Sequence, residues 1–213
     1  RWLSDWSSDV CSSDLNMTTT SYNGRFGQAI AMTDYLAASM NYGSIVPSIF
    51  HLTGGEWRIT QPADNYKRLP LYNIGMYFNR FCKGHTMQTQ LISNNKITNT
   101  YGQPINYDPV GAYAYNSGEN FSVLLMNRDF ENDFTIQLEL PSDIGFSDKA
   151  TIYTLWQNDF SSYNTKIDST EVSLTPDLLI KVPKFGMVVV NFKGDDPGYE
   201  KLPLGYWDRK RPE

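Results

Sequence analysis

The sequence predicts an α/β segment with the order helix–strand–helix, followed by an all-β antiparallel sandwich. Three observations indicate this order. Apolar residues recur at helical spacing in two stretches before residue 85, and one apolar, β-branched run lies between those stretches. After residue 85, seven short β-prone runs with turn residues between them follow one another, which is typical of a sandwich.

The first predicted helix begins near residue 26 and has one apolar face. Residues on that face recur at intervals of four, three, four and three, as one side of a helix requires. Gly43 follows, and a glycine there can adopt the left-handed backbone conformation that ends a helix. The face comprises Phe26, Ile30, Thr33, Ala37 and Met40.

A buried strand is predicted over residues 44–52, "SIVPSIFHL", where Pro47 fits only at an edge or a start. A loop with Gly and Pro follows, and a second helix comes after it. Gly84 lies at the end of this helix. The apolar face of the second helix comprises Leu71, Ile74, Phe78 and Phe81. Two helices around one strand are typical of a parallel α/β sheet, although one strand alone makes no sheet.

The strongest signal after residue 85 is a β-hairpin in "AYAYNSGENFSVLLMNR", with its turn at residues 117–120. In "FTIQLEL" the apolar residues alternate, which predicts a strand with one buried face. The seven runs are "TMQTQLI", "VGAYAYNS", "NFSVLLMN", "DFTIQLEL", "KATIYTLW", "LLIKVP" and "GMVVVNF". The residues from 194 onward are rich in Pro and Gly and are predicted to be an extension or linker.

Composition excludes several classes of partner and cofactor. Hydrophobic residues make up 40% and charged residues 19% of the 213 residues, which indicates a folded rather than a disordered chain. The net charge is −5 and only residues 209–211 cluster positive charge, so no nucleic-acid partner is expected. No apolar run is long enough to span a membrane. His51 and His85 are far apart and no Cys–His cluster occurs, so neither a metal nor another cofactor is expected. Cys82 is predicted to be a small buried apolar residue.

The opening residues differ from the rest of the chain. "SSDVCSSDL" has two Ser-Ser-Asp triplets and no hydrophobic period, and it resembles translated sequencing-adapter sequence, a contaminant of assembled environmental (metagenomic) contigs. We therefore expect residues 1–15 to be a non-native leader. The visible N-terminus then says nothing about secretion.

The order of the remaining parts resembles the C-terminal part of retaining glycoside hydrolases of the α-L-arabinofuranosidase, xylanase and xylosidase type. Two segments carry the resemblance, "NMTTTSYNGRFGQAIAMTDYLAASMNYGSIVPSIFHLTGGEW" and "VGAYAYNSGENFSVLLMNRDFENDFTIQLELP". It implies that residues 16–85 are the remnant of a (β/α)8, or TIM, barrel. Residues 86–193 would form the accessory β-sandwich, in which a strand ending in Leu-Leu-x-Asn-Arg is common.

In such enzymes the nucleophile is a Glu followed by an aromatic residue and Asn. The resemblance places Asn16 at that Asn, so the nucleophile is expected at position 14, where the chain has Asp14. An Asp is one methylene shorter than Glu, and the retaining geometry depends on the carboxylate separation. The acid/base Glu lies in a part of the barrel that this sequence does not contain. We therefore expect a fragment without hydrolase activity, derived from a hydrolase gene.

Substrate contacts are expected at the carboxyl ends of the barrel strands. There Trp57 would stack on a sugar ring, and Glu56 and His51 would hydrogen-bond sugar hydroxyls or line the pocket. Asn16 would bond a substrate hydroxyl beside the nucleophile. For each, a purely structural role stays open: a packed lid, a solvated loop charge, a core histidine and a turn residue.

The alternative is a non-catalytic carbohydrate-binding β-sandwich module, because the strands are rich in aromatic residues. Tyr113, Tyr115, Tyr153 and Trp156 would then form a sugar-binding platform, although packing into the core is expected more often for such residues. Either function implies a carbohydrate partner containing arabinose or xylose. A polymeric substrate implies a secreted or periplasmic protein.

Overall fold

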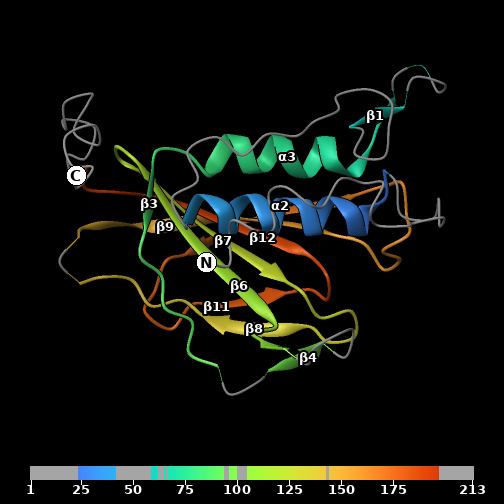
Figure 1. Cartoon of the computed structure of the whole chain (residues 1–213). Helices are drawn as coiled ribbons and strands as arrows, with labels where there is room; N and C mark the ends of the chain where they lie inside the picture. The colour runs from blue at the N-terminus through green and yellow to red at the C-terminus, as the bar shows by residue number, and fades with distance from the viewer. Residues whose placement is uncertain are drawn as a thin grey trace, which may run out of the picture.

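The computed structural model describes residues 24–41, 59–61, 65, 67–93, 96–99, 105–142 and 144–196. Over these residues it is mostly antiparallel sheet with two helices. Figure 1 shows three layers: the helices on one face of a large sheet, and a smaller pair of strands on the other face.

Helix α2 (Phe26–Asn41) buries the predicted apolar face. Phe26, Ile30, Thr33 and Ala37 are all buried, and Met40 packs at the margin of the same core. The backbone N–H groups of Phe26 and Gly27 donate hydrogen bonds of 2.8 Å to the carbonyl oxygens of Ser162 and Phe160. A loop of the sheet layer therefore satisfies donors that the first turn of a helix leaves unpaired. This joins α2 to the sheet at its N-terminal end.

Helix α3 (Pro70–Phe81) begins with proline at its first position, where no backbone N–H is needed. Its predicted face is confirmed, since Leu71, Ile74 and Phe78 are buried. Gly84 ends the helical segment with φ +78°, as predicted. Part of the loop before α3 forms a short antiparallel ladder of β1 (Thr60–Gln61) and β2 (Lys67–Arg68).

The main sheet has six strands in the order β10-β9-β12-β7-β6-β3, and every neighbouring pair is antiparallel. The predicted hairpin is confirmed, with Ser117 opposite Asn120 and Gly118 at φ +61° in the first central position of the turn. The six strands are β3 (His85–Met87), β6 (Val110–Ser117), β7 (Asn120–Asn127), β9 (Phe146–Trp156), β10 (Lys166–Ser173) and β12 (Met187–Gly194).

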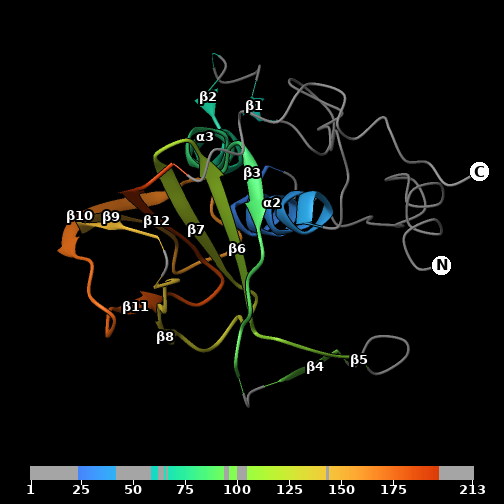
Figure 2. The same cartoon turned by 90° about the vertical axis from the view of Figure 1, so that its left-hand side faces the viewer.

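A second, smaller layer covers the face of the sheet opposite the helices. It consists of β8 (Phe134–Gln137) paired with β11 (Leu179–Val182), as Figures 1 and 2 show. The alternation predicted for "FTIQLEL" is confirmed, because Phe134, Ile136 and Leu138 pack on the core beneath this layer. A separate antiparallel pair of β4 (Ile97–Asn99) and β5 (Ile105–Tyr107) projects away from the two sheet layers in Figure 2.

The two faces of the sheet form two cores. On β7, Leu124 and Met126 pack toward the helices, while Val123 and Leu125 pack toward the β8–β11 pair. This alternation is the period-2 geometry of a strand buried on both sides. Each fully buried side chain of this size contributes about 1.5–3 kcal/mol of transfer free energy. The sheet thus holds the helices and the small layer together.

Three sequence predictions differ from the structure or fall outside it. In "TMQTQLI" only the start is strand, as part of β3, and the residues from 88 onward are irregular. Strands β4, β5 and β10 were not predicted, because their sequences lack a clear apolar alternation. The strand predicted at residues 44–52, and with it the parallel sheet, lies outside the described residues.

Candidate functional site

The residues proposed to contact substrate lie outside the described part of the chain. This applies to Asn16, His51, Glu56 and Trp57, and also to Asp14 at the expected nucleophile position. Their roles stay predictions.

The four aromatic residues of the alternative platform do not lie together. Tyr113 and Tyr115 are buried under the helices, as the packing interpretation predicted. Tyr153 also faces the helices and stacks on Phe81 with a centroid distance of 4.7 Å. Trp156 belongs to neither core. Its position is three residues from Tyr153, and an odd spacing along a strand reverses the face. The prediction of one platform made of all four residues is therefore wrong. Of the four, only Trp156 lies on the face of the sheet opposite the helices.

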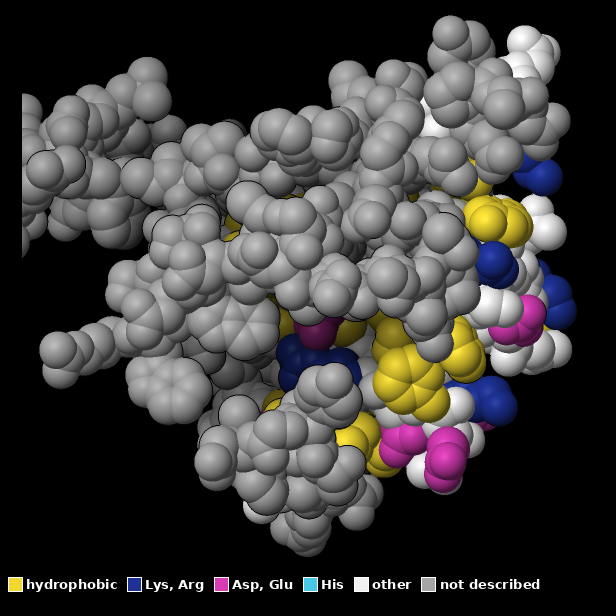
Figure 3. All heavy atoms as spheres, turned by 45° about the vertical axis from the view of Figure 1, so that its right-hand side comes forward, with side chains coloured by type: hydrophobic (Ala, Val, Ile, Leu, Met, Phe, Trp, Pro, Cys, Tyr) yellow, Lys and Arg dark blue, Asp and Glu magenta, His cyan; other side chains and the backbone are white. Residues whose placement is uncertain are grey.

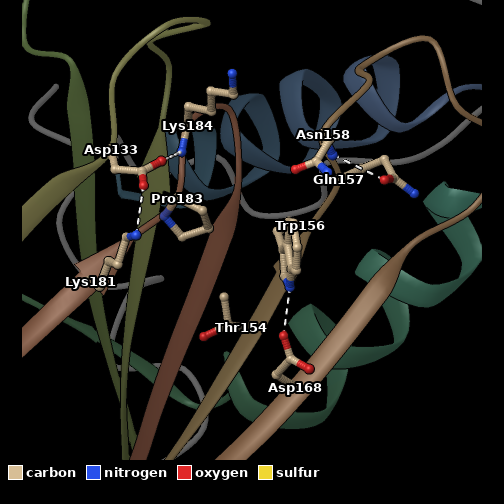
Figure 4. Close-up of a pocket in the computed structure, with 9 residues that line it drawn as sticks. All are labelled: Asp133, Thr154, Trp156, Gln157, Asn158, Asp168, Lys181, Pro183 and Lys184. Carbon is tan, nitrogen blue, oxygen red and sulfur yellow. Dashed lines mark hydrogen bonds and ion pairs between the residues drawn. The ribbon is translucent and has the colours of Figure 1, made fainter.

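Trp156 lines a half-open cavity of about 440 Å³. Its walls come from four segments of the chain: the end of β9 with the two residues after it, the first half of β10, the end of β11 with the turn after it, and the residue before β8. Figure 4 shows these side chains around the open space. They are Asp133, Thr154, Trp156, Gln157, Asn158, Asp168, Lys181, Pro183 and Lys184.

The cavity lies between the two strand layers, with lining residues from β9 and β10 on one side and from β11 on the other. The β8–β11 pair has two strands, and β11 lies over β7 in the middle of the six-stranded sheet. On the same face, Ile152 of β9 and Val172 of β10 pack on the core that contains Ile180 and Val182 of β11, whereas Thr154, Trp156 and Asp168 border the cavity.

The Trp156 ring is held in place by its neighbours on β10. Its Nε1–H donates a hydrogen bond of 2.6 Å to Oδ2 of Asp168. The Lys166 ammonium lies 4.4 Å from the ring centroid, within the range of a cation–π contact. In the ladder, Lys166 is directly opposite Trp156, and Asp168 is opposite Thr154. All four side chains therefore share one face of the sheet.

Asp133 fixes the opposite wall of the cavity. Its carboxylate forms an ion pair of 2.8 Å with Lys181 Nζ and accepts a 2.8 Å hydrogen bond from the backbone N–H of Lys184. The hydrogen bond from Lys181 and that from Lys184 hold the pKa of Asp133 below its usual range. The carboxylate is therefore charged at neutral pH, and it ties the turn after β11 to the start of β8.

A second polar cluster joins α2 to the sheet. The Arg128 guanidinium donates to both oxygens of Asp34, at 2.7 and 3.0 Å, and to the Tyr113 hydroxyl at 2.9 Å. Tyr113 in turn donates to Asp34 at 2.7 Å. Burial raises the pKa of Tyr113, and the Asp34 charge raises it further. Burial lowers the pKa of Arg128, but its bonds to Asp34 outweigh this and raise it. Arg128 also donates a hydrogen bond of 3.2 Å to the carbonyl oxygen of Asp108. These contacts tie helix α2 to the sheet, which indicates a structural role.

The last two residues of the Leu-Leu-x-Asn-Arg stretch, Asn127 and Arg128, both hold other elements against β7. Asn127 is fully buried and its amide donates to the carbonyl oxygens of Asn132 and Val182, at 2.9 and 3.3 Å. It thereby connects β7 to the end of β11. The Asn and Arg of this motif hold the second layer and the helix, respectively, against the same strand.

Exposed aromatic residues gather near the N-terminal end of α2. Phe130 stacks on Phe185 with a centroid distance of 4.2 Å and contacts Phe160 edge-on at 5.6 Å. Figure 3 shows hydrophobic side chains among acidic and basic ones on this side of the molecule. A second cavity, of about 480 Å³, follows α3 along Leu71, Tyr72 and Met76. Neither place combines an aromatic face with polar groups from several strands.

Within the described ranges, no group of three or more His, Cys, Asp or Glu side chains is arranged to hold a metal ion. The carboxylates of Asp129 and Asp195 accept hydrogen bonds from backbone N–H groups of the turns around them. Cys82 is buried, as predicted, and burial raises the pKa of its thiol. None of the helices described here is long and apolar enough to cross a membrane.

Comparison with known proteins finds similarity of structure alone. No protein-family model matches the sequence, and no curated protein is significantly similar to it. The solved α-L-arabinofuranosidase of Thermotoga maritima, in complex with arabinose, aligns with a TM-score of 0.64 at 17% identity. The alignment covers 78% of this chain and 38% of that enzyme.

Two further solved enzymes are similar. The family 51 α-L-arabinofuranosidase of Bifidobacterium longum aligns with a TM-score of 0.60 at 14% identity, over 80% of this chain and 35% of the other. The GH30 endoxylanase of Clostridium papyrosolvens aligns with a TM-score of 0.54 at 14% identity, over 81% of this chain and 39% of the other. At such identities the likeness establishes the fold. The chain has a glycoside-hydrolase-like fold and spans less than two fifths of the length of these enzymes.

Proposed function

We propose that this chain is the C-terminal part of a retaining glycoside hydrolase that acts on plant cell-wall polysaccharide containing arabinose or xylose. Helices α2 and α3 would be the last two barrel helices, and the sheet layers would be the accessory β-sandwich. Since such polymers lie outside the cytoplasm, the intact protein would be secreted or periplasmic.

The observation that carries this proposal is the extent of the structural alignment. Residues 86–193 make up about half of the chain, whereas the alignment with the Thermotoga maritima enzyme covers 78% of it. An alignment of that size has to extend beyond the sandwich into the segment that carries the helices. Sandwich domains alone occur with many functions, so the combination with the helices is more specific.

The packing between the two parts supports the same proposal. Helix α2 is capped by carbonyl groups of the sheet layer, buried against β6 and β7, and joined to them by Arg128 and Asp34. A fixed attachment of this kind is what we expect of a barrel helix that packs on an accessory domain.

In a retaining hydrolase one carboxylic acid protonates the leaving oxygen and a second carboxylate forms the glycosyl-enzyme intermediate. This chain would supply neither. Asp14 occupies the position expected for the nucleophile, and its carboxylate is one methylene short. Asn16, His51, Glu56 and Trp57 would contribute substrate contacts near the nucleophile once a complete barrel is present.

Activity assays test this function. We expect the 213-residue chain to release no arabinose or xylose from arabinoxylan, arabinan or their 4-nitrophenyl glycosides. A protein extended upstream with the gene's own barrel should hydrolyse at least one of these, with retention of anomeric configuration in ¹H NMR. Hydrolysis by the chain alone, or inversion by the extended protein, would contradict the proposal.

A further inference from the structure

We propose that the cavity at Trp156 is a carbohydrate-binding site on the sandwich, separate from the hydrolytic site of the proposed function. Its ligand is a neutral oligosaccharide, one sugar of which lies between the Trp156 ring and Pro183. The inference depends on the cavity itself and holds whether or not the chain belongs to a hydrolase.

The size and lining of the cavity fit a small sugar segment. A volume of about 440 Å³ is within the range of small-molecule sites, which combine an apolar surface with a few placed polar groups. Figure 4 shows the Trp156 ring nearly edge-on, with Pro183 to one side of it. The flat face of an indole matches the C–H face of a sugar ring.

The ring is prepared for such contact before a ligand arrives. The Asp168 hydrogen bond fixes its Nε1 edge, and Lys166 lies over the ring without lining the cavity. A side chain that is already immobilised loses little conformational entropy on binding. Trp156 belongs to neither hydrophobic core, so packing of the protein interior does not account for a Trp at this position.

Polar groups that can bond sugar hydroxyls surround the ring. Oδ2 of Asp168 accepts the hydrogen bond from Trp156, so Oδ1 is available to accept one from a sugar hydroxyl. Gln157 uses its Oε1 to accept from the Asn158 backbone, which leaves its amide N–H groups to donate. The Thr154 hydroxyl, two residues from Trp156 on the same face, makes no hydrogen bond within the described ranges. Donors and acceptors in this mixture suit hydroxyl groups, which do both.

Charge excludes other ligands of the same size. The residues that line the cavity include two acidic ones, Asp133 and Asp168, and two basic ones, Lys181 and Lys184, so no single sign of charge dominates the walls. Asp133 is already paired with Lys181. A strongly anionic or cationic ligand would meet like charge on one side, whereas a neutral sugar meets none.

Binding is tested on the full 213-residue chain with xylohexaose, arabinohexaose and cellohexaose as probes, by calorimetry. We expect at least one probe to bind. Trp156→Ala should then weaken binding about tenfold or more, as loss of an aromatic anchor does. Thr154→Val keeps the shape of the side chain and suits a strand, and its loss of one hydrogen bond should weaken binding three- to tenfold. Tyr35→Ala, which removes an exposed aromatic ring on α2, is the matched control and should change nothing.

A spectroscopic readout covers the case in which Trp156→Ala does not fold. The chain has five tryptophans, and comparison with Trp156→Phe assigns the Trp156 indole N–H signal in a ¹H–¹⁵N spectrum. That signal should shift when the probe is added. The proposal is overturned if none of the three probes binds at millimolar concentration. It is also overturned if binding occurs with the same affinity in Trp156→Ala and Thr154→Val and without a shift of this signal.

Discussion

The Arg128 guanidinium lies against the Asp34 carboxylate with two parallel hydrogen bonds, Nε to Oδ2 at 2.7 Å and Nη2 to Oδ1 at 3.0 Å. Asp34 is on helix α2 and Arg128 directly follows β7, 94 residues later. Their side chains are only 17% and 28% exposed. Paired bonds of this geometry are strong and directional. They fix the position of the helix along the sheet.

Loss of this ion pair should loosen the helix from the sheet. Arg128→Ala leaves the Asp34 carboxylate and the Tyr113 hydroxyl without their shared donor. We expect a loss of about 2–4 kcal/mol in the free energy of unfolding by urea, somewhat less than for a fully buried pair. Lys149→Ala breaks the exposed Lys149–Glu171 pair and serves as control, with no measurable change expected. Equal effects of the two substitutions would contradict this role.

Gly111 makes room for the Arg128 side chain. A Cβ at this position would lie 2.7 Å from Nη2 of Arg128 and 3.1 Å from Oδ1 of Asp34. Gly111→Ala should therefore destabilise the fold by about 1–3 kcal/mol. A Cβ added at Gly75 in α3 would have no atom within 4 Å. Gly75→Ala should therefore raise the free energy of unfolding by about 0.5–1 kcal/mol. In a double-mutant cycle, Gly111→Ala should cost much less when Arg128 is already Ala.

Gly84 is required both for its backbone conformation and for lack of a side chain. Its φ is +78°, and a Cβ would lie 2.1 Å from the carbonyl oxygen of Asn116. Gly118 has a similar φ of +61° but open space around it. Gly118→Ala should cost about 1–2 kcal/mol for the left-handed conformation alone. Gly84→Ala should cost clearly more in thermal or urea unfolding, and similar costs would show that the contact with β6 is not tight.

The Asp133 carboxylate should make stability depend on pH. Because its folded-state pKa is lowered by Lys181 and Lys184, its contribution is present above the unfolded pKa of about 3.9 and is lost as pH falls through the folded value. Asp133→Asn should thus lower the urea midpoint near neutral pH and leave it unchanged at about pH 2. The pair is exposed, so the difference will be small. A difference that persists at low pH would indicate lost packing instead.

Local patterns in the sequence predicted the elements that have an apolar face. The two helices and the β6–β7 hairpin are confirmed because their burial leaves a clear period of 3.6 or 2 in the residues. Strand β10 has no such pattern, since nearly all of its residues are exposed. Its strand conformation comes from the eight-residue ladder with β9, which a single-sequence pattern does not reveal.

The contacts between distant residues could not be predicted in the same way. The pairing of Asp34 with Arg128 joins positions far apart in sequence. Its only local signal is that Asp34 is the single charged residue of α2, placed in an otherwise apolar and polar-neutral helix. The cavity at Trp156 likewise joins segments that are far apart in sequence, from Asp133 to Lys184. Counting along β9 does show, however, that residues 153 and 156 lie on opposite faces.

The central claim, that the chain is the C-terminal part of a hydrolase, is tested most directly by a long sequencing read of the source DNA across codons 1–20. We expect an open frame that continues upstream and encodes Glu and an aromatic residue immediately before Asn16. A start codon close upstream of an intact "SSDVCSSDL" would contradict the claim, because the catalytic barrel would then never have been part of this protein.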